Sequence, residues 1–256
     1  LLGLPDLYNN LTGNSVVGNL CLMDGGAWLG PQGRAGSVPC HLSTFMKYIL
    51  GWQEPQPICL GCDGPDHLDG ASIGPHSTTP SAYSLLDNPG GMDWTNDGRG
   101  QGEYFLIENR QPRYGHFDSY VEGHGLVIWK VDESRANNND PKRRLADVIQ
   151  ADGGTMDPDL GQTQLPGDPS DFWPGSLERH AFTPYSVPSS NLSGNRFSGA
   201  AVENILEDQA GLVTADLRIG LSQRGKTYAY PNPYSLHETA PMRIVFLPTT
   251  GPAEPA

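Results

Sequence analysis

The first residues of the chain carry groups that could take part in metal chemistry. The sequence opens Leu1-Leu2-Gly3-Leu4-Pro5-Asp6-Leu7-Tyr8, in which Gly3 can end a helix and Asp6 follows three residues later. A carboxylate that the chain brings back toward the end of a helix can serve as a zinc ligand. An Asp after Gly-x-Pro is also a common turn residue, so the spacing alone leaves both interpretations open.

The spacing from Gly3 to Asp6 matches the second half of an extended zinc-peptidase motif, His-Glu-x-x-His-x-x-Gly-x-x-ligand. In that motif a helix presents two His at positions i and i+4, a Gly ends the helix, and the chain turns back so that a third side chain reaches the metal. Gly3 would be the helix-ending glycine and Asp6 the third zinc ligand. The two His and the general-base Glu would lie immediately before Leu1.

A methionine follows the candidate ligand in a glycine-rich turn, Leu22-Met23-Asp24-Gly25-Gly26-Ala27-Trp28. A Met in a tight turn soon after the third ligand is typical of metzincin peptidases, in which the thioether packs beneath the metal without coordinating it. The alternative is that Met23 is an ordinary core residue before a Gly-Gly turn. Taken together with Asp6, the pattern predicts a Met-turn at Met23.

Four separated stretches, in order over about residues 1–220, resemble the immune inhibitor A family of secreted bacterial metallopeptidases. They are the opening Gly-Leu-Pro-Asp-x-Tyr stretch, the turn at Met23, the segment 39–52, and the paired segments 103–111 and 125–133. The last pair reads Glu-Tyr-Phe-Leu-Ile-Glu-Asn-Arg-Gln and Gly-Leu-x-Ile-Trp-x-Val-Asp-Glu. The family commonly has His where this chain has Lys130, which weakens any catalytic role for that position.

This resemblance implies a zinc metalloendopeptidase that is secreted by a bacterium and acts on proteins or peptides. In the family's mechanism zinc polarises the scissile carbonyl and activates a water, and the motif Glu accepts the proton. Asp6 and Met23 are the members of that machinery found in this chain, so we expect the 256-residue chain alone to be inactive and to bind no stoichiometric zinc. The alternative is a non-catalytic secreted β-rich adhesion or binding domain, from a relative whose upstream motif has lost His or Glu.

The composition limits the other classes of function. With 32 Gly and 23 Pro, 37% hydrophobic and 18% charged residues, the chain favours short strands and long loops. The formal charge of −13 argues against binding to nucleic acid or to anionic membranes. We also expect no membrane span, because no apolar run reaches roughly 18 residues.

Acidic loops in the second half of the chain could bind calcium as a second cofactor. Calcium takes six to eight oxygen ligands, which loops can supply without the twelve-residue EF-hand spacing. Asx-turns and helix caps are the alternative use of such residues. The candidate calcium ligands are Asp132, Asp152, Asp168 and Asp171.

The cysteines are consistent with an extracellular protein. One or two disulfides in an oxidising compartment are favoured, while free thiols and a metal site stay open as alternatives. Spacing does not fix the connectivity. The four residues are Cys21, Cys40, Cys59 and Cys62.

The predicted elements are one helix and several strands. Apolar residues recur at three- and four-residue spacing over 37–51, which predicts an amphipathic helix. His41 falls beside its apolar face and is predicted to be structural, whereas His67 and His76 receive no role. Alternating or apolar runs bounded by Gly and polar residues predict strands. These strands cover 103–109 and 125–131, and a closing hairpin covers 201–206 and 212–219.

The predicted fold class is α+β and mostly β. We expect the C-terminal part of a metzincin-like peptidase over 1–54, followed by an antiparallel β-sandwich-like domain over 55–220, in which 52–102 is an irregular connection. Residues 221–256 would form a linker and the truncated start of an Ig-like domain, because a Tyr-Pro-Asn-Pro-Tyr box at 230–234 leads into an alternating strand at 242–248.

Overall fold

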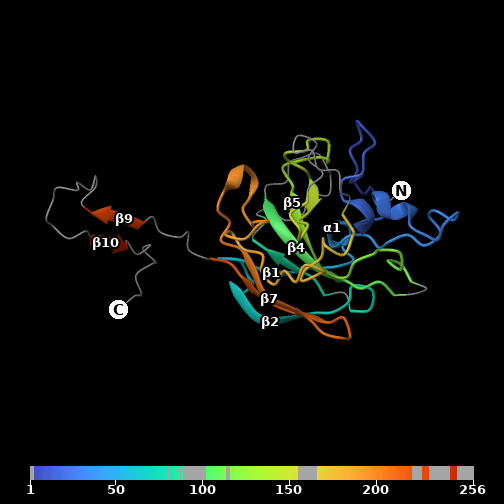
Figure 1. Ribbon diagram of the computed structural model, residues 1–256. Coiled ribbons are helices and arrows are strands. Elements are labelled where there is room, and N and C mark those ends of the chain that lie inside the picture. Colours follow the sequence, from blue (N-terminus) through green and yellow to red (C-terminus); the bar gives the residue numbers. More distant parts are fainter. Residues whose placement is uncertain are drawn as a thin grey trace.

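The computed structural model describes residues 3–79, 81–86, 88, 102–113, 116–154 and 166–220, together with the backbone of 227–230 and 243–246. Within these residues the protein is mostly β-structure with few helical turns, which confirms the predicted fold class in its coarse form. A five-stranded sheet lies at the centre. The N-terminal segment covers one of its faces, and a three-stranded sheet covers the other (Figure 1).

The two sheets are built from short strands. The larger has the order β1-β3-β4-β5-β6 and the smaller β2-β8-β7. All neighbours pair antiparallel except β1 and β3, which are parallel. The strands are β1 (Gln56–Ile58), β2 (His67–Ile73), β3 (Tyr83–Leu85), β4 (Glu103–Arg110), β5 (Gly125–Asp132), β6 (Ala146–Val148), β7 (Ala201–Glu207) and β8 (Val213–Arg218).

The central strands β4 and β5 confirm the two strong strand predictions. All eight residues of β4 are buried, because both faces of the sheet are covered. Successive side chains of a strand point to opposite faces. Tyr104 and Leu106 therefore pack with the N-terminal segment, while Phe105 and Ile107 pack with the second sheet.

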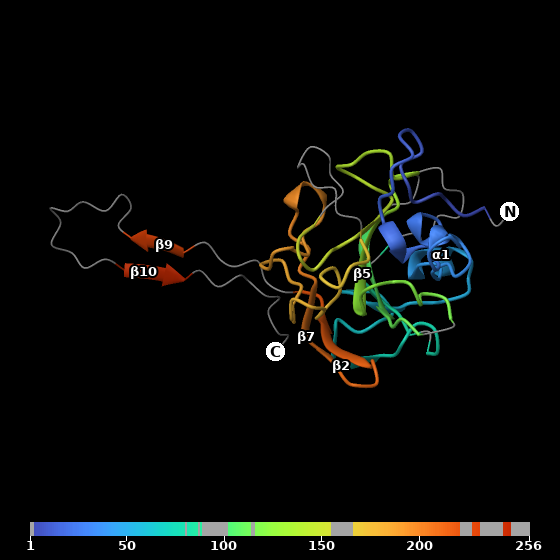
Figure 2. The same ribbon diagram turned by 45° about the vertical axis from the view of Figure 1, so that its right-hand side comes forward.

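The second sheet completes a β-sandwich. The predicted hairpin is present as β7 and β8, and the alternation in β8 buries Val213, Ala215 and Leu217. These residues share one core with Phe105 and Ile107 of the central sheet. Figures 1 and 2 both place α1 and the N-terminus on one side of β5, with β2 and β7 on the other.

The region expected to be an irregular connection contains strands, so that prediction is wrong. Between residues 52 and 102, β1 and β3 extend the central sheet, and β2 pairs with β8. β1 and β3 are each only three residues long, and their strand structure depends on pairing with neighbours distant in sequence. Local turn residues therefore gave a misleading signal.

The predicted helix is shorter than expected. The helix α1 spans Thr44–Ile49, and the hydroxyl of Ser43 caps it by accepting a hydrogen bond from Met46 N at 3.3 Å. Gly51 follows with φ +65°, which confirms the predicted end. In the part of the chain that the structure describes, the other helical turns are η1 (Gly18–Leu20), η2 (Gly25–Trp28) and η4 (Ser193–Asn195).

The predicted helix start at Ser37 is wrong because tertiary bonds occupy the preceding backbone. His41 N donates to Asp118 Oδ1 at 2.8 Å, and Leu42 O accepts from Arg110 at 3.1 Å. These bonds hold residues 41–42 outside the helix. Helical periodicity in the sequence does not reveal such partners.

The N-terminal residues and the central sheet share one hydrophobic core. Leu7, Phe45 and Met46 pack against residues of β4, β5 and β6 such as Trp129. We call residues 3–50 the site layer, because they form the layer on this face of the sheet. The domain boundary expected at residue 54 stays a prediction.

The last described strands are β9 (Thr227–Tyr230) and β10 (Arg243–Phe246), which pair antiparallel with each other. β10 lies within the strand predicted at 242–248. The Pro-Asn-Pro box and the rest of the predicted Ig-like start lie outside the described residues.

Candidate functional site

Asp6 and Met23 line the same cleft, which has a volume of about 470 Å³. The backbone joins their segments directly, since Leu7 N donates to Met23 O at 3.0 Å. Tyr8 and Trp28 also border the cleft, and Trp28 is 73% exposed. The structure thus brings together the predicted zinc ligand and the predicted Met-turn. We call this pocket the Asp6 cleft.

The carboxylate of Asp6 is held by its neighbour in the sequence. Tyr8 OH donates to Asp6 Oδ2 at 3.1 Å, and this hydrogen bond together with the nearby charge raises the pKa of Tyr8. Asp6 is half-buried, so its carboxylate combines a fixed orientation with access from the cleft. That combination suits a metal ligand, whose orientation a hydrogen-bonding partner commonly fixes.

A buried amide anchors the Asp6 segment to the central sheet. Asn138 Nδ2 donates to Leu7 O and to Ala146 O, both at 2.8 Å, and Asn138 Oδ1 accepts from Ala146 N at 3.0 Å. Asn139 Oδ1 accepts from Asn10 N at 2.8 Å. The loop that carries Asn138 and Asn139 therefore positions the candidate zinc ligand. Only the long-range contact reveals this role.

Hydrogen bonds to Asp24 stabilise the Met23 turn. One oxygen of this buried carboxylate accepts from Val16 N at 2.8 Å and from Val17 N at 2.7 Å, which closes the loop that leads into the turn. The turn also needs glycine at residue 26. A Cβ on Gly26 would lie 2.1 Å from Cys40 Sγ, a separation that no real side chain tolerates.

Arg110 fixes both ends of the segment that carries the Met23 turn. Its guanidinium is fully buried and donates through Nη2 to Leu20 O and to Leu42 O, each at 3.1 Å. It also pairs with Glu108 at 3.0 Å and with Asp118 at 2.9 Å. A single side chain of β4 therefore clamps the turn onto the sheet.

Glu108 is the centre of this buried polar cluster. Its carboxylate accepts hydrogen bonds from Trp129 Nε1 at 2.7 Å and from Thr44 Oγ1 at 2.8 Å, in addition to Arg110. Burial opposes ionisation, but the charge of Arg110 and the hydrogen bond from His76 hold the pKa of Glu108 well below its usual range. The Glu108 carboxylate is therefore ionised at neutral pH, and both of its oxygens accept hydrogen bonds.

His76 belongs to the same cluster, although sequence analysis assigned it no role. It is 3% exposed, its Nδ1 lies 2.8 Å from Glu108 Oε2, and its Nε2 contacts Lys47 Nζ. These partners indicate that the His76 ring is neutral. Its Nδ1–H donates to the Glu108 carboxylate, and its Nε2 accepts from the Lys47 ammonium. Burial lowers the pKa of His76, and it lowers the pKa of Lys47 to about 8.

His41 lies at the rim of the cluster. Its ring contacts His76 edge-on at 4.9 Å between centroids and Phe117 at 5.1 Å. Burial lowers the pKa of His41 to about 4. These contacts fit the structural role predicted for His41. We call Lys47, His76, Glu108, Arg110 and Asp118, with His41 at their rim, the buried ion network.

The structure separates Asp132 from the other calcium candidates. Arg143 donates to Asp132 Oδ2 from Nε at 3.0 Å and from Nη2 at 2.6 Å, and Ser134 N donates to Oδ1 at 3.1 Å. Because a guanidinium already neutralises this carboxylate, Asp132 has no need of a cation. Its placement argues against the calcium role that the sequence suggested.

The other three calcium candidates gather around Ser170. Its hydroxyl lies 2.5 Å from Asp168 Oδ1 and 3.4 Å from Asp152 Oδ2. Asp171 Oδ2 accepts from the backbone amides of Gly167 and Asp168 at 2.7 and 3.0 Å. Burial, together with the charges of Asp168 and Asp152, raises the pKa of Asp171 to about 7 despite these amide donors.

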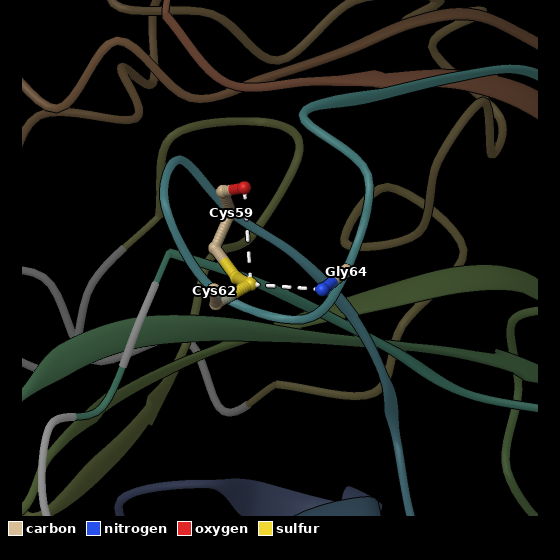
Figure 3. The surroundings of a disulfide bond; sticks show 3 residues. All are labelled: Cys59, Cys62 and Gly64. Atoms are coloured by element: carbon tan, nitrogen blue, oxygen red, sulfur yellow. Dashed lines mark hydrogen bonds between the residues drawn. A yellow bond between two sulfur atoms is a disulfide. The ribbon is translucent and has the colours of Figure 1, made fainter.

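The cysteines divide between one disulfide and two thiols. Cys59 and Cys62 form a disulfide with their Cα atoms 5.9 Å apart, and Gly64 N donates to Cys62 Sγ at 3.2 Å (Figure 3). Cys21 and Cys40 are free and buried in the site layer, where burial raises the pKa of both thiols. Cys59 and Cys62 thus form a disulfide of the predicted kind, whereas the alternative of free thiols holds for Cys21 and Cys40.

The described residues do not by themselves form a zinc site. Among them, no group of three or more His, Cys, Asp or Glu side chains is arranged to hold a metal ion. Asp6 fits as one carboxylate ligand beside a thioether. Within the same residues no helix is long and apolar enough to cross a membrane.

Comparison with known proteins gives no match to a family model, a curated protein or a solved structure. The resemblance to the immune inhibitor A family therefore depends on the sequence stretches described above.

Proposed function

We propose that this chain is part of a secreted zinc-dependent metalloendopeptidase of the immune inhibitor A type. The observation that carries the proposal is that Asp6 and Met23 line one cleft and are joined by the bond from Leu7 N to Met23 O. A plain turn residue and a plain core methionine have no reason to meet at a cavity.

Each residue of the Asp6 cleft has a defined task in this proposal. Asp6 is the third ligand, Tyr8 orients its carboxylate, and Met23 forms the apolar floor. Exposed Leu22 and Trp28 offer apolar surface to a peptide substrate. Zinc, once held, would polarise the scissile carbonyl and activate water.

The first test is to read the coding sequence immediately upstream of Leu1. The proposal requires His-Glu-x-x-His to end at the residue before Leu1, so that two His join Asp6 and the Glu serves as the general base. Any other residues at those three positions would refute the peptidase and favour the non-catalytic binding domain.

The second test replaces Asp6 in the polypeptide that includes the upstream motif. We expect Asp6→Ala to abolish hydrolysis of a casein substrate and to remove zinc, measured by atomic absorption, while the far-UV circular dichroism stays unchanged. Asp6→Glu keeps a carboxylate and should retain part of the zinc. The matched control, Asp69→Ala, removes an exposed carboxylate on β2 and should leave both activity and zinc unchanged. Full activity of Asp6→Ala would rule out its role as a ligand.

The disulfide supports the extracellular part of the proposal. Bonds such as Cys59–Cys62 persist in oxidising compartments and are rare in reducing ones. The chain without its upstream residues is expected to bind no stoichiometric zinc. One tightly held zinc per 256-residue chain would redirect attention from Asp6 to other residues.

A further inference from the structure

Two loops beside β6 present buried oxygens that lack hydrogen-bonding partners. Residues 149–154 follow β6, and residues 166–173 lie against them, held by Ala151 N to Asp171 O at 3.0 Å and by Trp173 Nε1 to Ile149 O at 3.1 Å. Gln150 is 1% exposed and Asp171 2% exposed. Both Gln150 Oε1 and Asp171 Oδ1 are buried without a partner.

The unpartnered amide oxygen points toward the acidic residues. A Cβ built on Gly154 would lie 2.3 Å from Gln150 Oε1 and 2.9 Å from Asp152 Oδ1, so both oxygens lie beside this glycine, whose N–H donates to Asp152 Oδ1 at 2.6 Å. Ser170 links the second oxygen of Asp152 to Asp168, the residue whose backbone amide binds Asp171. Ala151, which lies between Gln150 and Asp152, donates its N–H to Asp171 O, so the two loops bring Gln150, Asp152 and Asp171 together.

This arrangement is costly without a cation. A buried oxygen without a donor loses its hydrogen bonds to water with nothing in return, and carboxylates placed close together repel one another. Asp132 and Asp147 are each paired with an arginine. Among the described residues, by contrast, Asp152 and Asp171 have no ion pair with Lys, Arg or His, and the charges of Asp152 and Asp168 act on Asp171.

We propose that Gln150 Oε1, Asp152 and Asp171 Oδ1 bind a calcium ion that fastens the loop 149–154 to the loop 166–173. Calcium accepts amide and carbonyl oxygens beside carboxylates in irregular geometry, so the site does not need three convergent carboxylates. Asp168 adds negative charge at the same place. Magnesium fits less well because it demands octahedral geometry and keeps its waters. The proposal is independent of zinc and of the Asp6 cleft.

The test is calcium titration of the 256-residue chain after removal of metal with a chelator. We expect one calcium per chain by isothermal titration calorimetry and a melting temperature that rises with calcium concentration but not with equal magnesium. Terbium is a second probe. Trp173 is bonded to the loop that carries Gln150, so it should sensitise terbium luminescence, and calcium should quench that luminescence by competition.

Two variants separate the ligand role from a structural role. Asp171→Asn keeps an oxygen for the amides of Gly167 and Asp168, and Gln150→Met keeps the side-chain volume. Each should lower calcium affinity at least tenfold, yet melt no lower than the wild type in chelator, because each removes an unsatisfied buried oxygen. The control Asp132→Asn should melt lower because it loses the charge partner of Arg143, and it should keep its calcium affinity. Absence of calcium binding by the wild type, or unchanged affinity in both variants, would overturn the proposal.

Discussion

The two faces of the central sheet are stabilised by different kinds of interaction. On the sandwich face, apolar side chains of two sheets pack together, and strand ladders satisfy the backbone. On the other face, the site layer has little regular structure. Buried side chains satisfy much of its backbone instead, including Arg110 at Leu20 O and Leu42 O, and Asn138 at Leu7 O.

This difference shows where the candidate site is vulnerable. A ladder distributes its hydrogen bonds over many residues, so the loss of one side chain leaves the others in place. The site layer depends on a few buried polar groups, each of which holds several backbone atoms. We therefore expect substitutions in the buried ion network to loosen the Asp6 cleft before they affect the sandwich.

Arg110→Met should have the largest effect. It leaves Glu108 and Asp118 buried without their main counter-charge, and breaking a buried pair in this way costs about 3–5 kcal/mol. We expect hydrogen exchange, followed by mass spectrometry, to accelerate first in residues 16–46 and only later in β7 and β8. Uniform acceleration through the whole chain would contradict the distinction between the two faces.

The control for that experiment is Ile107→Ala, three residues earlier on the same strand. Ile107 points to the sandwich face, where its truncation should cost about 2–5 kcal/mol. The two variants therefore lose comparable stability, but on opposite faces. Ile107→Ala should accelerate exchange in β7 and β8 at least as much as in the site layer.

Acid should produce a smaller and graded loosening of the site layer. The folded pKa of His41 is lowered from 6.5 to about 4, so the folded state binds fewer protons than the unfolded state between these values. Stability that is present above pH 6.5 is therefore lost as the pH falls toward 4. Glu108 and Asp118 also have lowered pKa values in the folded state. Stability therefore continues to fall as the pH drops below the ordinary pKa values of these two carboxyl groups.

Exchange rates corrected for the intrinsic effect of pH would measure this. We expect residues 41–49 to lose protection between pH 7 and pH 4, while β8 stays protected. Parallel loss on both faces would show that the network does not control the acid response.

Ser43→Ala should have the smallest effect, because it removes one cap from a short helix. Ser43 Oγ accepts from Met46 N at 3.3 Å, and losing such a cap costs about 1 kcal/mol. Urea denaturation should show that loss, while Ser43→Thr, which keeps the hydroxyl, should lose less. Equal losses in both variants would assign the effect to packing around the buried Ser43 rather than to the cap.

The sequence predicted the elements whose pattern is local. The strands β4, β5, β7 and β8 were predicted because their apolar runs and bounding turns lie within a few residues. β1, β2 and β3 were missed because pairing with distant strands determines them. The helix start was misplaced for a related reason, since Asp118 and Arg110 bind residues 41–42 from the middle of the chain.

The candidate site was predictable to a similar extent. Asp6 and Met23 were predicted as site residues because their spacing follows a metal-site pattern, and the structure places both at one cleft. His76, Arg110 and Asn138 were missed because a buried polar residue shows its partner only after folding. Gln150 was missed as well, since nothing in the sequence marks an unsatisfied amide.

Oxidation of the two thiols in the site layer would report how often this layer opens. Cys21 and Cys40 are inaccessible while the layer is closed, and the raised pKa of each keeps it in the unreactive protonated form. Exposure of either thiol to oxidant therefore requires the Met23 turn to leave the sheet. In an oxidising environment, the chain would accumulate oxidative damage at the rate at which this layer opens.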